Sequence, residues 1–109
     1  PNWLFGPAWT ILYIMIAVAG WRAWRAGGIS PALTFWALNI IANALWSYIM
    51  FGQRNIGLAL IDASAMWLTI VGFIALSWNL DRTAALLFVP YLAWVSFAAV
   101  LNFTIWRLN

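Results

Sequence analysis

The stretch PYLAWVSFAAVLNFTIWRLN, Pro90–Asn109, decides how the rest of the chain is interpreted. It belongs to an uncharged run from Thr83 to Trp106, which as a helix is long enough to cross a bilayer core of roughly 30 Å. At steps of three and four residues, one side of this helix carries Tyr91, Trp94, Ala98, Leu101 and Ile105. A lipid anchor needs only aliphatic residues. Aromatic rings, a small gap at alanine and the amide of Asn102 instead predict a helix that lines a pocket.

The composition indicates an integral membrane protein. The chain has 109 residues, of which 67% are hydrophobic and 6% are charged, and a soluble domain of this size cannot bury so much apolar surface. Five arginines and two aspartates are too few to form a nucleic-acid-binding face, so no nucleic-acid partner is expected. Histidine and cysteine are absent, which removes disulfides and the usual protein ligands of zinc and haem iron. No metal site and no required cofactor are therefore predicted.

The charged residues divide the chain into four apolar runs. We predict an all-α, polytopic membrane bundle with four transmembrane helices, near residues 3–24, 31–51, 56–78 and 84–107. Gly27-Gly28, Ser30-Pro31, Gly52 and Asn79 supply the turns, and Pro90 is expected to kink the last helix.

Four spans that alternate direction place the amino end, the 52–55 turn and the carboxyl end on one side of the membrane, here called face B. A rise of about 1.5 Å per residue then gives each side chain a depth from face B. Depths of about 9 to 20 Å are shared by Trp9, Asn43, Trp46, Asp62, Trp67, Trp94, Phe97, Ala98 and Leu101. All four helices therefore contribute to one polar and aromatic layer that opens toward face B. For Asp62, a polar point in the pocket and a carboxylate that packs helices together both stay open.

Three segments carry a resemblance to a known family. PNWLFGPAWTILY, NALWSYIMFGQRNIGLALID and LLFVPYLAWVSFAAVLNFTIWRLN resemble the tryptophan-rich sensory protein (TspO) family, which includes the mitochondrial translocator protein, the peripheral benzodiazepine receptor. The family has five transmembrane helices and commonly forms homodimers. The resemblance implies that residues 1–109 are a single TspO-like domain that corresponds to helices two to five, without the first helix, and that two copies associate.

The resemblance also implies a ligand site. The family binds tetrapyrroles such as protoporphyrin IX and haem, sterols, and isoquinoline or benzodiazepine compounds, in a pocket that opens to the cytosolic side. The positions that match its ligand-contacting residues are Phe5, Gly6, Ala8, Trp9, Asn43, Trp46, Leu58, Ala65, Trp94, Phe97, Ala98 and Leu101. Animal members have a Tyr in a cholesterol-recognition pattern near the end of the last helix, and the segment 101–107 has none, so the expectation of sterol binding is weaker. Animal members also have a Trp at the position of Leu58.

Three functions are compatible with these observations. The preferred one is a membrane receptor or carrier for a planar hydrophobic ligand, a porphyrin, on which aromatic rings stack while Asn43 bonds to a polar edge. The alternative is a light-dependent porphyrin-degrading enzyme, to which some bacterial members of the family are similar, with Trp46 and Trp94 taking part. A small proton-coupled multidrug transporter is less favoured, because its carboxylate belongs in the first helix and Asp62 lies in the third. A bacterial membrane is expected rather than the mitochondrial outer membrane.

Overall fold

The computed structural model describes residues 2–53 and 55–108, and within them every side chain except those of residues 2–5, 50, 51, 53 and 56. Every regular element in these ranges is a helix, which confirms the predicted all-α membrane bundle. The elements are α1 (Asn2–Gly27), α2 (Pro31–Ser47), the π-helix η1 (Tyr48–Gln53), α3 (Ile56–Ser77), α4 (Arg82–Leu87) and α5 (Val89–Leu108). Within the described residues, the segments Gly57–Ser77 and Arg82–Leu108 are both long and apolar enough to cross a membrane.

The predicted turn residues between α1 and α2 act as helix caps, whereas Gly52, also predicted in a turn, lies inside the π-helix η1. Gly28 has a φ of 62°, in the left-handed region that glycine tolerates, and its N–H donates to the carbonyl of Trp24 at 2.7 Å to end α1. The Ser30 hydroxyl accepts the Leu33 N–H at 3.3 Å, and Pro31 follows at the first position of α2, where its missing N–H costs nothing. Local sequence chemistry therefore fixes the connection between α1 and α2.

Two of the predicted spans depart from a single regular helix. The last one breaks at Phe88, because Pro90 has no N–H to offer the carbonyl of Leu86. The chain tightens there, and the Phe88 N–H bonds to the Ala85 carbonyl at 3.1 Å, so the expected kink at Pro90 is confirmed. The second span loses its α-helical geometry at Ser47 and continues as the wider π-helix η1. The pattern of apolar residues had suggested one α-helix through residue 51.

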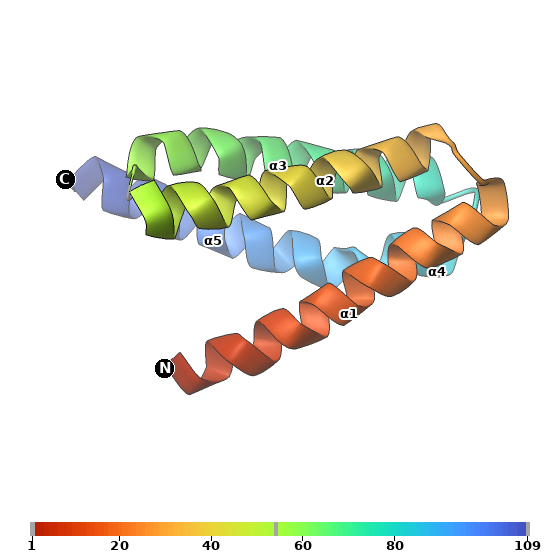
Figure 1. Ribbon diagram of the computed structural model, residues 1–109, viewed down its shortest axis with the longest axis horizontal. Helices are drawn as coiled ribbons and strands as arrows, with labels where there is room; N and C mark the ends of the chain where they lie inside the picture. The colour runs from red at the N-terminus through yellow and green to blue at the C-terminus, as the bar shows by residue number, and fades with distance from the viewer. Residues whose placement is uncertain (1, 54, 109) are drawn as a thin grey trace.

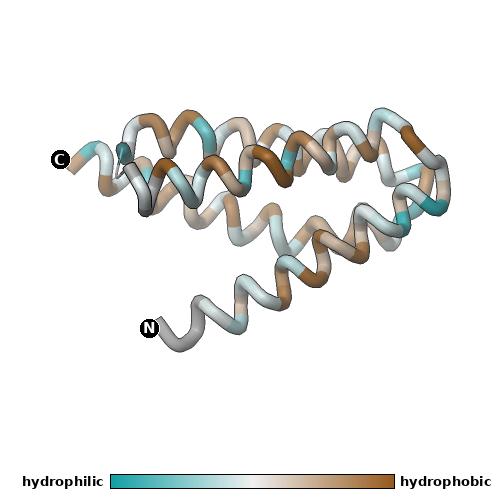
Figure 2. Tube along the Cα trace, viewed as in Figure 1, coloured by the Kyte–Doolittle hydropathy of each residue, from teal (hydrophilic) through white to brown (hydrophobic). Residues whose placement is uncertain are grey.

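Figure 1 shows α2, α3 and α5 lying along one another, while α1 leans away from them toward its start. The start of α1, the connection from α2 to α3 and the end of α5 lie at the same end of the molecule, as predicted for face B. Apolar positions run along every helix in Figure 2, and hydrophilic colour is strong where α1 ends. Large apolar side chains such as Ile11, Ile61 and Val100 are 58 to 68% exposed, as lipid-facing residues would be.

An aromatic cluster joins the break in the last span to α3. The rings of Phe73 and Phe88 are 4.3 Å apart, and Phe88 meets Tyr91 edge to face at 5.3 Å. All three side chains are fully buried. The bundle is therefore closely packed at the α3–α4–α5 junction, where the helix ladder is interrupted.

Helix α1 contacts α2 at Gly20. The Trp36 indole lies over this glycine and donates its Nε1–H to the Ile16 carbonyl at 2.8 Å. A Cβ added at Gly20 would stand only 2.3 Å from the indole ring. The hydrogen bond holds that ring in place, so α1 and α2 can meet here only because position 20 has no side chain.

Replacing Gly20 with alanine is therefore expected to destabilise the bundle by about 1–3 kcal/mol, the usual cost of overpacking a close contact. The free energy of unfolding in a denaturing-detergent titration measures it. Gly6→Ala is the matched control, since nothing lies within 4 Å of a Cβ added there and the change reports helix propensity alone. Equal stability of the two variants would contradict the role assigned to the Gly20–Trp36 contact.

Candidate ligand-binding site

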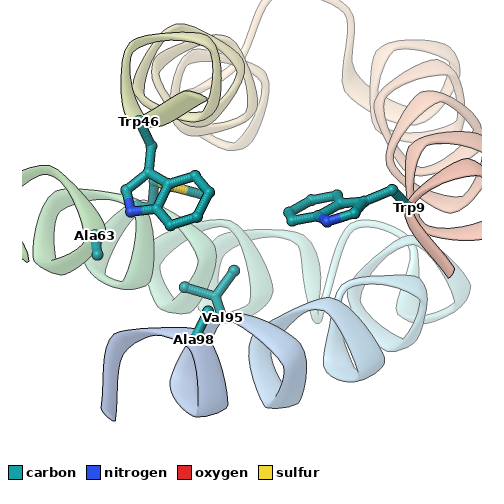
Figure 3. Close-up of a pocket in the computed structure, with 6 residues that line it drawn as sticks. Trp9, Trp46, Ala63, Val95 and Ala98 are labelled. Atoms are coloured by element: carbon teal, nitrogen blue, oxygen red, sulfur yellow. The ribbon is translucent and has the colours of Figure 1, made fainter. Parts of the chain in front are cut away.

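Two tryptophans from the predicted set of site residues face one another across a small internal cavity. Figure 3 shows Trp46 from α2 and Trp9 from α1 pointing toward each other above Val95 and Ala98 of α5. Ala63 and Met66 of α3 complete the lining. The cavity, here called the inner pocket, has a volume of about 10 Å³, which is about enough for one water molecule. In this conformation the inner pocket cannot hold an organic ligand.

A much larger hollow lies between α1 and α5. It has a volume of about 530 Å³, inside the range of roughly 300–1,000 Å³ that is usual for small-molecule sites. The side chains that line it are almost all apolar: Ala8, Ile11, Leu12, Met15, Pro90, Ala93, Trp94 and Phe97. We call it the α1–α5 groove. It exists because α1 diverges from the bundle in this region.

The Trp9 and Trp94 rings relate the inner pocket to the groove. Trp9 lines the inner pocket and Trp94 lines the groove, and their ring centroids are 6.0 Å apart in an edge-to-face arrangement. Phe97 lies one turn from Trp94 with its ring 6.5 Å away, and its side chain is 60% exposed. The contact between the two indoles thus links the wall of the inner pocket to the wall of the groove.

The structure divides the predicted site residues into groups. Trp9, Trp46 and Ala98 line the inner pocket, whereas Ala8, Trp94 and Phe97 line the groove. Four others are exposed and line neither cavity: Gly6, Leu58, Ala65 and Leu101. Phe5 lies in α1, and its side chain is outside the described residues. The expected aromatic layer is therefore split between two cavities rather than gathered around one.

Asn43, the remaining predicted residue, belongs to a buried polar chain. Its Nδ2–H donates to the Tyr91 hydroxyl at 2.7 Å, and its Oδ1 accepts from the Tyr13 hydroxyl at 3.4 Å. This chain connects α2 with α5 and α1. On α2 one turn away, Asn39 donates to the Thr69 hydroxyl of α3 at 3.1 Å. Both asparagines thus bind helices together, and within the described residues one of the two Nδ2 hydrogens of Asn43 makes no hydrogen bond.

Sequence reasoning placed Tyr91 on the pocket side of its helix but assigned no role to either tyrosine. The signal was the spacing: Tyr13 follows Trp9 by four residues, and Tyr91 precedes Trp94 by three. Asp62 is half-buried, and its Oδ2 is buried and has no hydrogen-bond partner among the described residues.

Tyr91→Phe is expected to lower the free energy of unfolding by about 0.5–2 kcal/mol, because it removes the acceptor of a buried amide hydrogen. Denaturing-detergent titration measures this loss. Tyr13→Phe should cost less, since the Tyr13 side chain is 48% exposed and its bond to Asn43 is long. The importance given to the Asn43–Tyr91 bond is wrong if the Tyr13 substitution proves the more damaging.

Comparison with known proteins decides the family. The model of the TspO/MBR family matches residues 1–107. The chain belongs to the TspO/MBR family. Its relatives include Protein CrtK of Rhodobacter capsulatus, which is 38% identical over 100% of this chain and 71% of its own length. The Tryptophan-rich protein TspO of Archaeoglobus fulgidus is 39% identical over 100% of this chain and 72% of its own length.

This TspO/MBR chain is also similar to animal proteins. The human Translocator protein is 31% identical over 100% of the chain and 68% of its own length. The resemblance seen in the sequence is thus confirmed, and the chain is a member of a membrane sensor and receptor family.

Proposed function

We propose that this TspO/MBR chain is a membrane receptor or carrier for a planar hydrophobic ligand, a porphyrin such as protoporphyrin IX or haem. The observation that carries the proposal is the α1–α5 groove, an apolar hollow of about 530 Å³ with the rings of Trp94 and Phe97 in its wall. A flat macrocycle gains from stacking on such rings, and burial of its apolar faces supplies most of the affinity.

The proposed geometry places the macrocycle in the groove with one edge directed at Trp9. The inner pocket would receive that edge only after the Trp9 ring turns, because its present volume is about 10 Å³. Ala98 then provides room on the α5 side, and the amide group of Asn43 is the proposed polar donor to the edge of the macrocycle. The chain contains no histidine or cysteine, so haem would be held by stacking rather than by the usual iron ligands.

We also propose that the protein is a homodimer in a bacterial membrane. On α2, the side opposite the polar chain leaves Ala37 exposed and Ile41 57% exposed, so these positions are free to pack against a second copy. Cross-linking in lipid at several dilutions tests the proposal. A monomer at every dilution would refute it.

The central experiment is a titration with protoporphyrin IX, first in darkness and then under illumination. A receptor binds saturably in darkness and leaves the absorption spectrum unchanged in light beyond ordinary bleaching. A light-dependent porphyrin-degrading enzyme, the second candidate, converts the ligand to a new product. The 6.0 Å edge-to-face contact between Trp9 and Trp94 supports the enzyme as a second candidate, because both tryptophan rings would lie beside the macrocycle. Failure to bind in darkness would overturn both.

A further inference from the structure

The end of the bundle opposite face B concentrates positive charge. Arg22 and Arg25 lie near the end of α1, and Asp81 and Arg82 begin the last span. A hollow of about 210 Å³ opens among Arg22, Arg25, Ala26 and Asp81, and its lining is mainly polar. We call this hollow the arginine cleft. It shares no lining residue with the α1–α5 groove, and the proposed porphyrin site makes no use of it.

Arg22 is only partly engaged by the one acidic residue here. Its Nε lies 3.2 Å from both carboxylate oxygens of Asp81. A guanidinium has five N–H donors, and in the described part of the chain the terminal nitrogens of Arg22 make no hydrogen bond. Asp81 is itself held in place, since its Oδ1 caps α4 by accepting the Ala84 N–H at 3.1 Å.

The Asp81 carboxylate stays ionised. Desolvation acts to raise the pKa of Asp81, but the Ala84 N–H and the Arg22 guanidinium together outweigh it and hold that pKa below its ordinary value. This end of the molecule thus carries one negative charge, on Asp81, and three positive charges, on Arg22, Arg25 and Arg82. Positive charge remains in excess.

Within the described residues, Arg25 and Arg82 form no ion pair with a carboxylate. The sequence contains two acidic residues, and the other one, Asp62, lies within α3 some 15 residues, or about 22 Å, from the end of that helix. Each of the two arginines instead lies over an indole: Arg25 is 4.8 Å from the Trp21 ring centroid, and Arg82 is 4.8 Å from that of Trp78. A guanidinium stacked on a ring keeps its in-plane N–H groups available.

We infer that the arginine cleft binds the phosphate of an anionic phospholipid, with Arg25 and the terminal nitrogens of Arg22 as its donors and Arg82 as a neighbouring positive charge. Guanidinium forks match phosphate oxygens in geometry and charge. The source of the phosphate is assigned to lipid because Trp21 and Trp78 are 52% and 40% exposed at helix ends, where tryptophan belongs at the level of the headgroups.

The test compares two lipids that share their acyl chains and a phosphate group but differ in the net charge of the headgroup. The purified chain in neutral detergent is titrated with phosphatidylglycerol or phosphatidylcholine of identical acyl chains, and native mass spectrometry counts the bound lipid. Arg25→Gln should weaken phosphatidylglycerol binding about fivefold, the factor that corresponds to about 1 kcal/mol per arginine near an anionic surface. Phosphatidylcholine binding should not change.

Arg107→Gln is the matched control, because it removes the same charge from an exposed position at the other end of the bundle. It should bind phosphatidylglycerol as the unmodified chain does, and Arg25→Lys should recover part of the loss. An equal loss of phosphatidylglycerol binding in Arg107→Gln would show that only the net charge of the chain matters, and it would refute a binding site at the arginine cleft. Competition by inorganic phosphate at low millimolar concentration would overturn the assignment to lipid, since the cleft would then hold the free anion.

Discussion

Trp94→Ala is expected to weaken the binding of protoporphyrin IX in darkness by about 1–3 kcal/mol, or roughly 5- to 150-fold. The Trp94 ring lines the α1–α5 groove and also meets Trp9 edge to face. Its removal would delete a stacking surface and leave the Trp9 ring without its neighbour. Quenching of tryptophan fluorescence or a porphyrin absorbance titration gives the dissociation constant.

Trp78→Ala is the control for Trp94→Ala. The Trp78 side chain is 40% exposed at the opposite end of the bundle and lies beneath Arg82, so its loss should leave porphyrin binding nearly unchanged. Trp46→Ala should fall between the two, because Trp46 lines only the inner pocket. If Trp78→Ala harms binding as much as Trp94→Ala does, the ligand site has been placed at the wrong end.

Ala93→Trp is expected to abolish porphyrin binding, which is the largest effect that we predict. Ala93 lines the groove and is exposed, so an indole placed there would occupy the volume proposed for the macrocycle without entering the packed core. Thermal unfolding should therefore be close to that of the unmodified chain, while the absorbance titration should show no saturable binding.

The same enlargement at Val100 serves as the control. The Val100 side chain is 65% exposed on α5 and lines neither the groove nor the inner pocket, so Val100→Trp should bind normally. Ala98→Trp tests which of the two cavities holds the ligand, since Ala98 lines the inner pocket and not the groove. Normal binding in Ala93→Trp together with no binding in Ala98→Trp would move the ligand out of the groove and into the inner pocket.

The sequence alone was sufficient for the class of fold and for the presence of tryptophans in the walls of the cavities. Long uncharged runs that end at arginines have few alternatives to membrane helices, and glycine, serine and proline mark their ends by local geometry. Depth along a helix also follows from a fixed rise per residue, which is why Trp9 and Trp46 were correctly expected at one level.

The division of the site between two cavities could not be predicted in this way. It depends on the tilt of α1, and helix tilt is set by packing against neighbours rather than by the length of an apolar run. The contact between Gly20 and Trp36 contributes to that packing, and it joins positions distant in sequence. The partners of Asn43 were missed for the same reason, because depth does not reveal which hydroxyl faces an amide.

The close contact at Gly20 holds one half of α1 in place while the other half can change its tilt. The buried side chains of α1 run from Leu12 to Ala23, whereas none in the range 6–11 is buried, so this helix is clamped along one half and free along the other. Ala8 lies 12 residues from Gly20, an arm of about 18 Å, over which a swing of about 10° moves the helix by about 3 Å. That distance approaches the separation of about 3.5 Å between stacked rings. A single small pivot could therefore set whether the groove is wide enough to admit a flat molecule.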